Sequence, residues 1–235
     1  MSLSKEDPRA VHLRSVLGVK DGDEIDLAVK NGPRGKGKVS LLPDQRVDLA
    51  IRWSERHPCD LFPVHLIVGF ARPQICRKIL EQASAIGVER ISFFQSDKGE
   101  PSYAKSRLWT TNEWMERIDQ GAEQAFASFV PTCELLVTLE QALSATWREE
   151  AFKIALDNYE ASQPLTTDAS DGKRPVVLAL GPERGWSASE RKLLRSRNFE
   201  MRHLGQRVLR LETAVVASLG VLLAGYWPDA CTESL

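Results

Sequence analysis

Residues 175–190, PVVLALGPERGWSASE, contain the strand, turn and helix start that decide the fold. Val176–Leu180 is apolar at every position, which is typical of a strand buried on both faces of a parallel sheet. In Gly181–Gly185 the glycines allow close backbone approach, and Pro182 stiffens the turn. Ser187–Glu190 matches a capping box, so a helix is expected to begin there. Because ligands bind beyond the carboxyl ends of strands in open α/β sheets, the turn is a candidate binding site.

A second glycine-containing turn follows at residues 205–210, GQRVLR. Glu200–Leu204 before it is expected to form a short strand, and an apolar helix is expected from Glu212 to Tyr226. Two such turns at successive strand ends could line one pocket. Ordinary connections between a strand and a helix explain the same spacing equally well, so both interpretations stay open on spacing alone.

Strand and helix patterns alternate along most of the chain before these turns. Short apolar runs predict strands at 64–68, 91–94, 134–137, 152–156 and 175–180, and helical spacing of apolar residues predicts helices at 73–86, 111–126 and 139–147. Residues 159–173 are polar and are expected to form a loop. The alternation predicts an α/β fold with a mainly parallel sheet covered on both faces.

The first 58 residues have a different, β-rich pattern. Apolar residues at helical spacing end at Gly18, and alternating segments predict half-buried strands at 24–29 and 47–51. Arg34–Lys38 alternates glycine with cations, and its glycines do not follow the order of a dinucleotide-binding loop, so we expect a flexible hairpin loop there. Prolines within residues 57–63 mark a linker to the second domain.

The composition is that of a soluble globular protein, with 43% apolar and 27% charged residues. The longest apolar run, Thr213–Trp227, is shorter than the roughly 20 residues that span a bilayer, and no basic and apolar leader opens the chain. We therefore expect a cytoplasmic protein that makes no membrane contact. The formal net charge of −1 gives no overall attraction to nucleic acid, so an RNA partner would need local basic patches.

The four cysteines, Cys59, Cys76, Cys133 and Cys231, are widely separated and form no C-x-x-C pair. The four histidines show no ligand spacing with them. Small buried thiols in a reducing compartment are the expected state. The sequence therefore predicts neither a disulfide framework nor a metal site.

Two motifs carry a family resemblance. They read Leu180-Gly181-Pro182-Glu183-x-Gly185, followed by Ser187-x-x-Glu190, and Leu204-Gly205-x-Arg207-Val208-Leu209-Arg210-x-Glu212-Thr213-Ala214. This ordered pattern resembles the C-terminal signature of the RsmE family, which are SPOUT-type methyltransferases that act on uridine N3 of bacterial small-subunit (16S) ribosomal RNA. A weaker likeness, His12-Leu13-x-x-Val16-Leu17 with Asp21-Gly22-Asp23, resembles the PUA-like barrel at the N-terminus of that family.

The resemblance implies a fold and a cofactor that spacing alone does not give. It implies a small PUA-like, RNA-binding β-barrel at 1–58 and a SPOUT methyltransferase domain at 63–235, whose C-terminal helix is threaded through a loop as a trefoil knot. The protein would be a homodimer that acts on ribosomal RNA or the small ribosomal subunit. S-adenosylmethionine would bind in the knot, without a metal. The residues implied to line this cofactor are Leu156, Leu180, Gly181, Glu183, Gly185, Leu204, Gly205, Val208 and Leu209.

Arg207, Arg210 and Glu212 match charged positions of the family motif. Arg210 is a candidate for stabilising negative charge on the uracil as the N3 proton leaves, with Glu212 orienting the arginine. A structural ion pair with a helix cap is the alternative for these two residues. The proton acceptor stays open between a carboxylate such as Glu183 and a water molecule. The candidate RNA-binding residues are Arg9, Arg14, Arg34, Lys36, Lys38 and Arg207, for which a solvated charged face is the alternative.

Arg184 and the stretch 125–128 depart from the family pattern. Arg184 stands where the family usually has glycine, and Ala125-Phe126-Ala127-Ser128 stands where a Gly-Arg pair usually follows Glu-Gln. These departures favour a divergent member, with the alternative of a catalytically altered protein that binds RNA or methylates a different RNA. A nucleotide-dependent enzyme such as a small dehydrogenase is disfavoured, since G-x-G-x-x-G does not follow the first parallel strand and G-x-x-x-x-G-K-[ST] does not occur.

Overall fold

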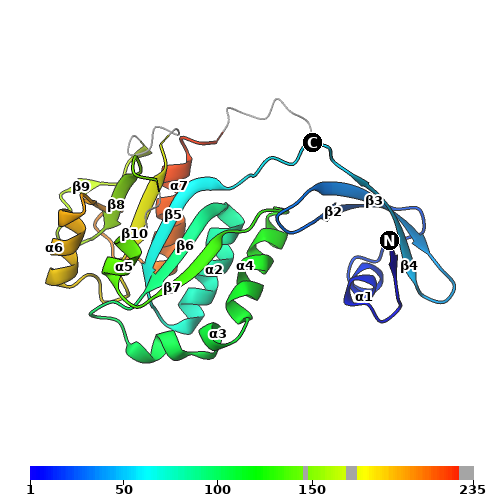
Figure 1. Ribbon diagram of the computed structural model, residues 1–235, viewed down its shortest axis with the longest axis horizontal. Helices are drawn as coiled ribbons and strands as arrows, with labels where there is room; N and C mark the ends of the chain where they lie inside the picture. The colour runs from blue at the N-terminus through cyan, green and yellow to red at the C-terminus, as the bar shows by residue number, and fades with distance from the viewer. Residues whose placement is uncertain (145–147, 168–173, 228–235) are drawn as a thin grey trace. The chain divides into compact units, whose positions relative to one another are not determined.

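A computed structural model describes residues 1–144, 148–167 and 174–227 (Figure 1). The chain divides into two compact units, Met1–Asp60 and Leu61–Leu235. The division falls inside the proline-containing segment 57–63. Each unit has its own hydrophobic core, so each is described by itself.

The N-terminal unit is an antiparallel sheet with one helix. The helix α1 spans Pro8–Ser15, and the strands are β1 (Ser2–Leu3), β2 (Glu24–Ala28), β3 (Arg34–Leu41) and β4 (Val47–Trp53). The strands are arranged in the order β1-β4-β3-β2. Asp7 caps α1 by accepting a hydrogen bond from the Arg9 N–H at 2.9 Å. The helix packs Ala10 and Leu13 against inward-facing strand residues such as Val39.

Residues 34–38 do not form the predicted hairpin loop, because they are the first half of β3. Their alternation of glycine and cation has the period of two that a strand requires. A Cβ on Gly35 would lie 2.7 Å from the Trp53 ring, and a Cβ on Gly37 would lie 2.7 Å from the side chain of Leu27. The glycines are therefore explained by crowding from the two neighbouring strands rather than by flexibility.

The larger unit is built on a parallel sheet. Its strands are β5 (Phe62–Gly69), β6 (Val88–Phe94), β7 (Thr132–Leu136), β8 (Phe152–Leu156), β9 (Gln163–Pro164), β10 (Val176–Leu180) and β11 (Glu200–His203). Within the described residues the order is β7-β6-β5-β10-β8-β11-β9, and every neighbouring pair runs parallel. The prediction of a mainly parallel sheet is confirmed. The trefoil knot implied by the resemblance stays a prediction.

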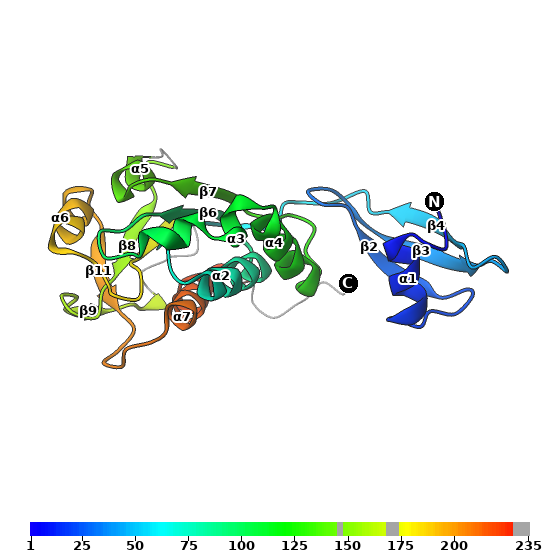
Figure 2. The ribbon, with the colours of Figure 1, turned by 90° about the horizontal axis from the view of Figure 1, so that it is seen from below.

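Helices cover both faces of this sheet, as Figures 1 and 2 show. They are α2 (Pro73–Ile86), α3 (Arg107–Thr110), α4 (Glu113–Gln124), α5 (Leu139–Ser144), α6 (Ala188–Ser196) and α7 (Leu211–Leu223), together with a 3₁₀ turn at Pro101–Lys105. Leu66 faces the core under α2, α4 and α7, whereas the next residue, Ile67, faces the core under α5 and α6. Alternate strand residues therefore enter two cores, which explains the uninterrupted apolar runs.

Several predicted boundaries are wrong for local reasons. Phe62 and Pro63 belong to β5 rather than to the linker, and the register of β5 shifts between Phe62 and His65, where Pro63 has no N–H to donate. The predicted helix 111–126 begins only at Glu113, after the separate helix α3. The predicted loop 159–173 contains β9, while its residues 168–173, like 145–147 of the predicted helix 139–147, lie outside the described residues. No described helix is both long and apolar enough to cross a bilayer.

Helices α2 and α4 approach each other closely at Gly121. A Cβ there would lie 2.2 Å from the Glu81 carbonyl oxygen and 2.9 Å from the Ser84 Cβ. We expect Gly121→Ala to lower the free energy of unfolding by about 1–3 kcal/mol, because the two helices must separate. The matched control is Gly220→Ala on α7, where a Cβ meets no atom of the described residues within 4 Å and the helix should gain about 0.5–1 kcal/mol. Urea unfolding of both variants gives the comparison, and equal stabilities would contradict the packing argument.

Candidate functional site

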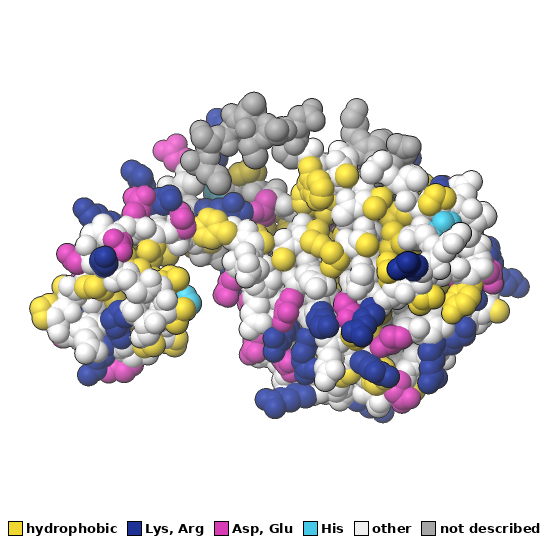
Figure 3. Space-filling model, turned by 180° about the vertical axis from the view of Figure 1, so that it is seen from behind, with side chains coloured by type: hydrophobic (Ala, Val, Ile, Leu, Met, Phe, Trp, Pro, Cys, Tyr) yellow, Lys and Arg dark blue, Asp and Glu magenta, His cyan; other side chains and the backbone are white. Residues whose placement is uncertain are grey.

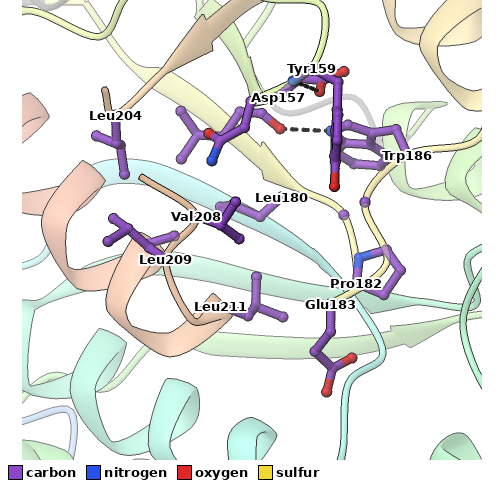
Figure 4. A pocket seen from close by; sticks show the side chains of 15 residues that line it. Asp157, Tyr159, Leu180, Pro182, Glu183, Trp186, Leu204, Val208, Leu209 and Leu211 are labelled. Atoms are coloured by element: carbon purple, nitrogen blue, oxygen red, sulfur yellow. Dashed lines mark hydrogen bonds between the residues drawn. The ribbon is translucent and has the colours of Figure 1, made fainter. Parts of the chain in front are cut away.

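One pocket lies at the carboxyl ends of three neighbouring strands (Figure 4). Leu156 and Leu180 are the last residues of β8 and β10, and Leu204 directly follows β11. These ends lie side by side because β8 pairs with both β10 and β11. Figure 4 places Val208 and Leu209 across the pocket from the turn that follows β10. The pocket therefore occupies the edge at which open α/β sheets bind ligands.

The structure brings most of the predicted cofactor residues to this pocket. Eight of the nine line it, namely Leu156, Leu180, Gly181, Glu183, Gly185, Leu204, Val208 and Leu209. Gly205 is not among the lining residues. The two glycine-containing turns thus border the same pocket, as the first of the two interpretations of their spacing predicts.

The turn after β10 is held in a fixed shape. Gly185 has a φ of +66°, a conformation that residues with a side chain rarely adopt, and its N–H donates to the Pro182 carbonyl at 2.8 Å. The next residue, Trp186, is buried, donates from Nε1 to the Leu156 carbonyl at 2.8 Å, and stacks on Phe94. The indole therefore ties the turn to the end of β8.

The predicted capping box at the start of α6 is confirmed. The Ser187 Oγ accepts from the Glu190 N–H at 3.1 Å, and the Glu190 carboxylate accepts from the Ser187 N–H at 2.7 Å. The Ser187 and Ser189 hydroxyls both donate to Asp97, at 2.6 and 2.7 Å, and these hydrogen bonds lower the pKa of Asp97. Asp97 follows β6, so the box joins a second loop to the same edge of the sheet.

A buried ion pair supports the rim of the pocket beyond β8. Asp157 is 4% exposed, and its Oδ2 accepts from the Arg191 Nε at 2.5 Å. Its Oδ1 accepts from the Tyr159 N–H at 2.8 Å. Burial by itself would raise the pKa of Asp157, but the hydrogen bonds from Arg191 and the Tyr159 N–H outweigh burial and hold this pKa below its usual range. The segment after β8 is thereby fixed to α6.

A groove rich in cations adjoins the pocket. The two share Glu183, Leu209 and Leu211, so the groove continues from the pocket toward the start of α2. Its charged lining residues are Arg72, Lys78, Lys98, Arg184 and Arg210, with the carboxylates Glu100, Glu183 and Glu212. We name these five cations and the surface between them the basic groove. The excess of positive charge suits a polyanionic ligand.

Arg210 and Glu212 both border the basic groove but do not contact each other as expected. Arg210 is the N-cap residue of α7, is exposed, and makes no side-chain hydrogen bond or ion pair within the described part of the chain. Glu212 is 6% exposed, its Oε1 accepts from Lys78 Nζ at 3.3 Å, and its Oε2 is buried without a partner among the described residues. The expected pair fails because residues two apart at a helix start point in different directions.

The comparison with protein families decides the identity. The sequence model for the RNA methyltransferase domain matches residues 57–223. The chain belongs to the RNA methyltransferase family. A ribosomal RNA small subunit methyltransferase E from Treponema pallidum (strain Nichols) is 31% identical over 230 residues, which is 94% of this chain and 85% of that relative. The resemblance to RsmE proteins is thus confirmed, and the dehydrogenase alternative is excluded.

Solved structures of similar proteins share the fold of this RNA methyltransferase. A ribosomal RNA small subunit methyltransferase E from Neisseria gonorrhoeae, bound to S-adenosyl methionine, gives a TM-score of 0.77 at 22% identity and covers 95% of this chain and 91% of that one. A methyltransferase from Legionella pneumophila, in complex with the same cofactor, gives a TM-score of 0.73 at 23% identity with the same coverage. The shared architecture spans both units of the chain.

The two departures from the RsmE pattern occupy defined places in the methyltransferase. Arg184 lines the basic groove, so the residue that replaces glycine adds a cation beside the pocket. Phe126 follows α4 with a φ of +52°, which is the left-handed conformation that glycine favours after a helix. The glycine-like backbone is therefore kept at position 126 although the side chain is large.

The predicted RNA-binding residues of the N-terminal unit mostly have partners within the chain. Arg9 pairs with Asp7 at 2.8 Å, Lys36 pairs with Asp26 at 2.5 Å, Arg34 pairs with Asp60, and Arg14 donates to backbone carbonyls. Figure 3 shows basic side chains interspersed with acidic ones on one face of this unit. Lys38 and Arg207 are exposed, and Arg207 follows Gly205 near the pocket. The RNA role of all six residues stays a prediction.

Sequence reasoning missed several residues of the site. Asp157, Asn158 and Tyr159 line the pocket directly after the strand predicted at 152–156. Their position beyond a strand end was a usable signal. Lys78 gave no such signal, because it reaches the groove from the second turn of α2 and contacts Glu212 only through tertiary packing.

Proposed function

We propose that this chain transfers a methyl group from S-adenosylmethionine to N3 of a uridine in 16S ribosomal RNA. The observation that carries the proposal is the junction of a largely apolar pocket with the basic groove, through Glu183, Leu209 and Leu211. A methyl donor in the pocket and a polyanion in the groove would meet at this junction. Relatives named ribosomal RNA small subunit methyltransferase E support the same substrate.

The residues of the pocket suit this cofactor. Leucine and valine side chains from three strand ends form apolar walls for the adenine and ribose, and the turn at 181–185 offers backbone groups free of a bulky side chain at Gly181 and Gly185. A Cβ on Gly181 would already lie 3.2 Å from Trp186, so the turn leaves little room for a larger residue there. When bound, S-adenosylmethionine supplies a methyl group activated by its sulfonium.

The basic groove suits the RNA backbone. The side chains of Arg72, Lys98 and Arg184 make no hydrogen bond or ion pair within the described residues, so they are available to phosphates. Such contacts position the RNA without reading its sequence. The N-terminal unit, residues 1–58, would add phosphate contacts as a PUA-like domain. Most of its candidate cations are paired within the chain, but a surface ion pair contributes only about 0–1 kcal/mol, so a phosphate can displace the carboxylate.

Arg210 and Glu212 would have separate catalytic roles, the first in stabilising charge and the second in accepting a proton. Arg210, whose side chain has no hydrogen bond or ion pair among the described residues, would stabilise negative charge on the uracil oxygens as N3 loses its proton. The proton would pass to the Glu212 carboxylate, which lines the groove and accepts a hydrogen bond from Lys78. The N3 lone pair would then form the new N–CH₃ bond, with the electron pair of the broken S–CH₃ bond left on the sulfur of the methyl donor. Alignment of the two reactants supplies much of the acceleration.

The chain would act as a homodimer, as the resemblance implies. Val208 is 80% exposed beside the pocket, and Val216 is partly exposed on α7. Covering these apolar side chains would favour association. Light scattering after size-exclusion chromatography should give twice the monomer mass of 26.3 kDa, and a monomer at micromolar concentration would overturn this part of the proposal.

The proposal is tested with the purified full chain, labelled S-adenosylmethionine, and either 16S ribosomal RNA or small subunits that lack 3-methyluridine. Calorimetry measures cofactor binding, and mass spectrometry of digested nucleosides locates the label. We expect cofactor binding and 3-methyluridine formation. Label on another nucleoside would overturn uridine N3 as the target. Cofactor binding without transfer would support the catalytically altered alternative. Absence of cofactor binding would overturn the whole proposal.

A further inference from the structure

Tyr159 is an exposed aromatic residue at the edge of the pocket. It is 77% exposed, yet it lines the pocket. Its hydroxyl makes no hydrogen bond within the described residues. Figure 4 shows its side chain beside Trp186, on the side of the pocket formed by the 181–185 turn. The exposed ring is therefore available to a ligand that enters the pocket.

Tyr159 is held by contacts to both its backbone and its ring. The Tyr159 backbone N–H donates to Asp157, which is buried and accepts hydrogen bonds from Arg191. The Arg191 guanidinium carbon lies 5.9 Å from the Tyr159 ring centroid, within the range of a cation–π contact. Arg191 also lies 3.4 Å from a carboxylate oxygen of Glu160, the next residue along the chain. Burial of the Asp157–Arg191 pair carries a desolvation penalty, so the pair is better explained by a role in orienting the Tyr159 ring than by a gain in stability.

The ring also lies close to the glycine turn. A Cβ built on Gly185 would lie 3.6 Å from the Tyr159 ring, so the ring borders the residue with the left-handed backbone. Any larger residue at 185 would contact the ring as well as strain the backbone. The absence of a side chain at 185 therefore leaves the ring accessible from the pocket.

We propose that Tyr159 stacks on the adenine of S-adenosylmethionine and that the Asp157–Arg191 pair positions its ring. This inference rests on the proposed use of that cofactor. A flat base with a π-face is the ligand group that an exposed, braced aromatic ring recognises best. The apolar leucines of the pocket would enclose the rest of the adenosine, and the tyrosine hydroxyl would stay in solvent. Affinity would then depend on the ring and not on the hydroxyl.

Calorimetry with S-adenosylmethionine and S-adenosylhomocysteine tests the stacking. Tyr159→Ala should weaken both affinities about tenfold, whereas Tyr159→Phe should bind within twofold of the unaltered protein. In the methylation assay, Tyr159→Ala should raise the cofactor KM by a similar factor and keep kcat at saturating cofactor. Arg191→Met should weaken binding several-fold while Tyr159 is intact, because the ring loses its brace.

The matched control is Phe126→Ala, which removes an exposed aromatic ring that borders neither the pocket nor the basic groove. It should leave both affinities unchanged. If the unaltered protein binds cofactor and Tyr159→Ala binds equally well, the stacking inference fails and the proposed function stands. If Tyr159→Phe is as weak as Tyr159→Ala, the hydroxyl carries the affinity and stacking is again wrong. If the unaltered protein binds no cofactor, the proposed function itself fails.

Discussion

Replacing Arg210 by alanine is expected to lower kcat by about 10²–10³-fold, the usual loss when a donor that stabilises developing negative charge is removed. Arg210 begins α7 at the junction of the pocket and the basic groove, and its side chain has no partner within the described residues. The substitution therefore removes no hydrogen bond or ion pair of the guanidinium with the described residues. Cofactor affinity should change less than twofold, because Arg210 lines the groove and not the pocket.

Single-turnover transfer from labelled S-adenosylmethionine measures this effect without interference from product release. Arg210→Lys keeps the charge but loses the planar guanidinium, so it should recover only part of the rate. Lys192→Ala serves as the matched control, because it removes an exposed cation of α6 that borders neither cavity. If Arg210→Ala keeps full kcat, Arg210 takes no part in the chemistry and serves only as the N-cap residue of α7.

The parts of the site that could be predicted from sequence are those fixed by neighbouring residues. The strand β10, the turn at 181–185 and the capping box of α6 follow one another within fifteen residues, so their pattern is local. Apolar periodicity, glycine and proline placement and a serine–glutamate cap each point to the same structure there. The agreement of independent local signals is what made this stretch predictable.

The parts that could not be predicted depend on residues far apart in sequence. Lys78 and Glu212 are 134 residues apart, and Asp157 and Arg191 are 34 apart. Such pairs form only after helices dock on the sheet, and no local pattern encodes them. The same limit produced the error at β3, because its glycines are explained by Leu27 and Trp53 on the adjacent strands.

Glutamine at position 212 should leave the fold intact and remove most of the activity. The Glu212–Lys78 pair joins a buried carboxylate to a half-exposed ammonium, so its loss should cost about 1 kcal/mol or less. Loss of a positioned general base typically costs about 10²–10⁴-fold in rate. We therefore expect Glu212→Gln to have near-normal thermal stability and cofactor binding, with kcat reduced by that factor.

The control for Glu212→Gln is Glu100→Gln, which makes the same change of charge at another carboxylate of the basic groove. Glu100 is exposed, whereas Glu212 is buried and its Oε2 has no partner among the described residues, so of these two carboxylates only Glu212 is shielded from competing water. If both variants lose the same small factor, the effect is the general electrostatics of RNA binding. If Glu212→Gln keeps full turnover, the N3 proton leaves to water, and Glu212 serves only to hold Lys78 at the edge of the groove.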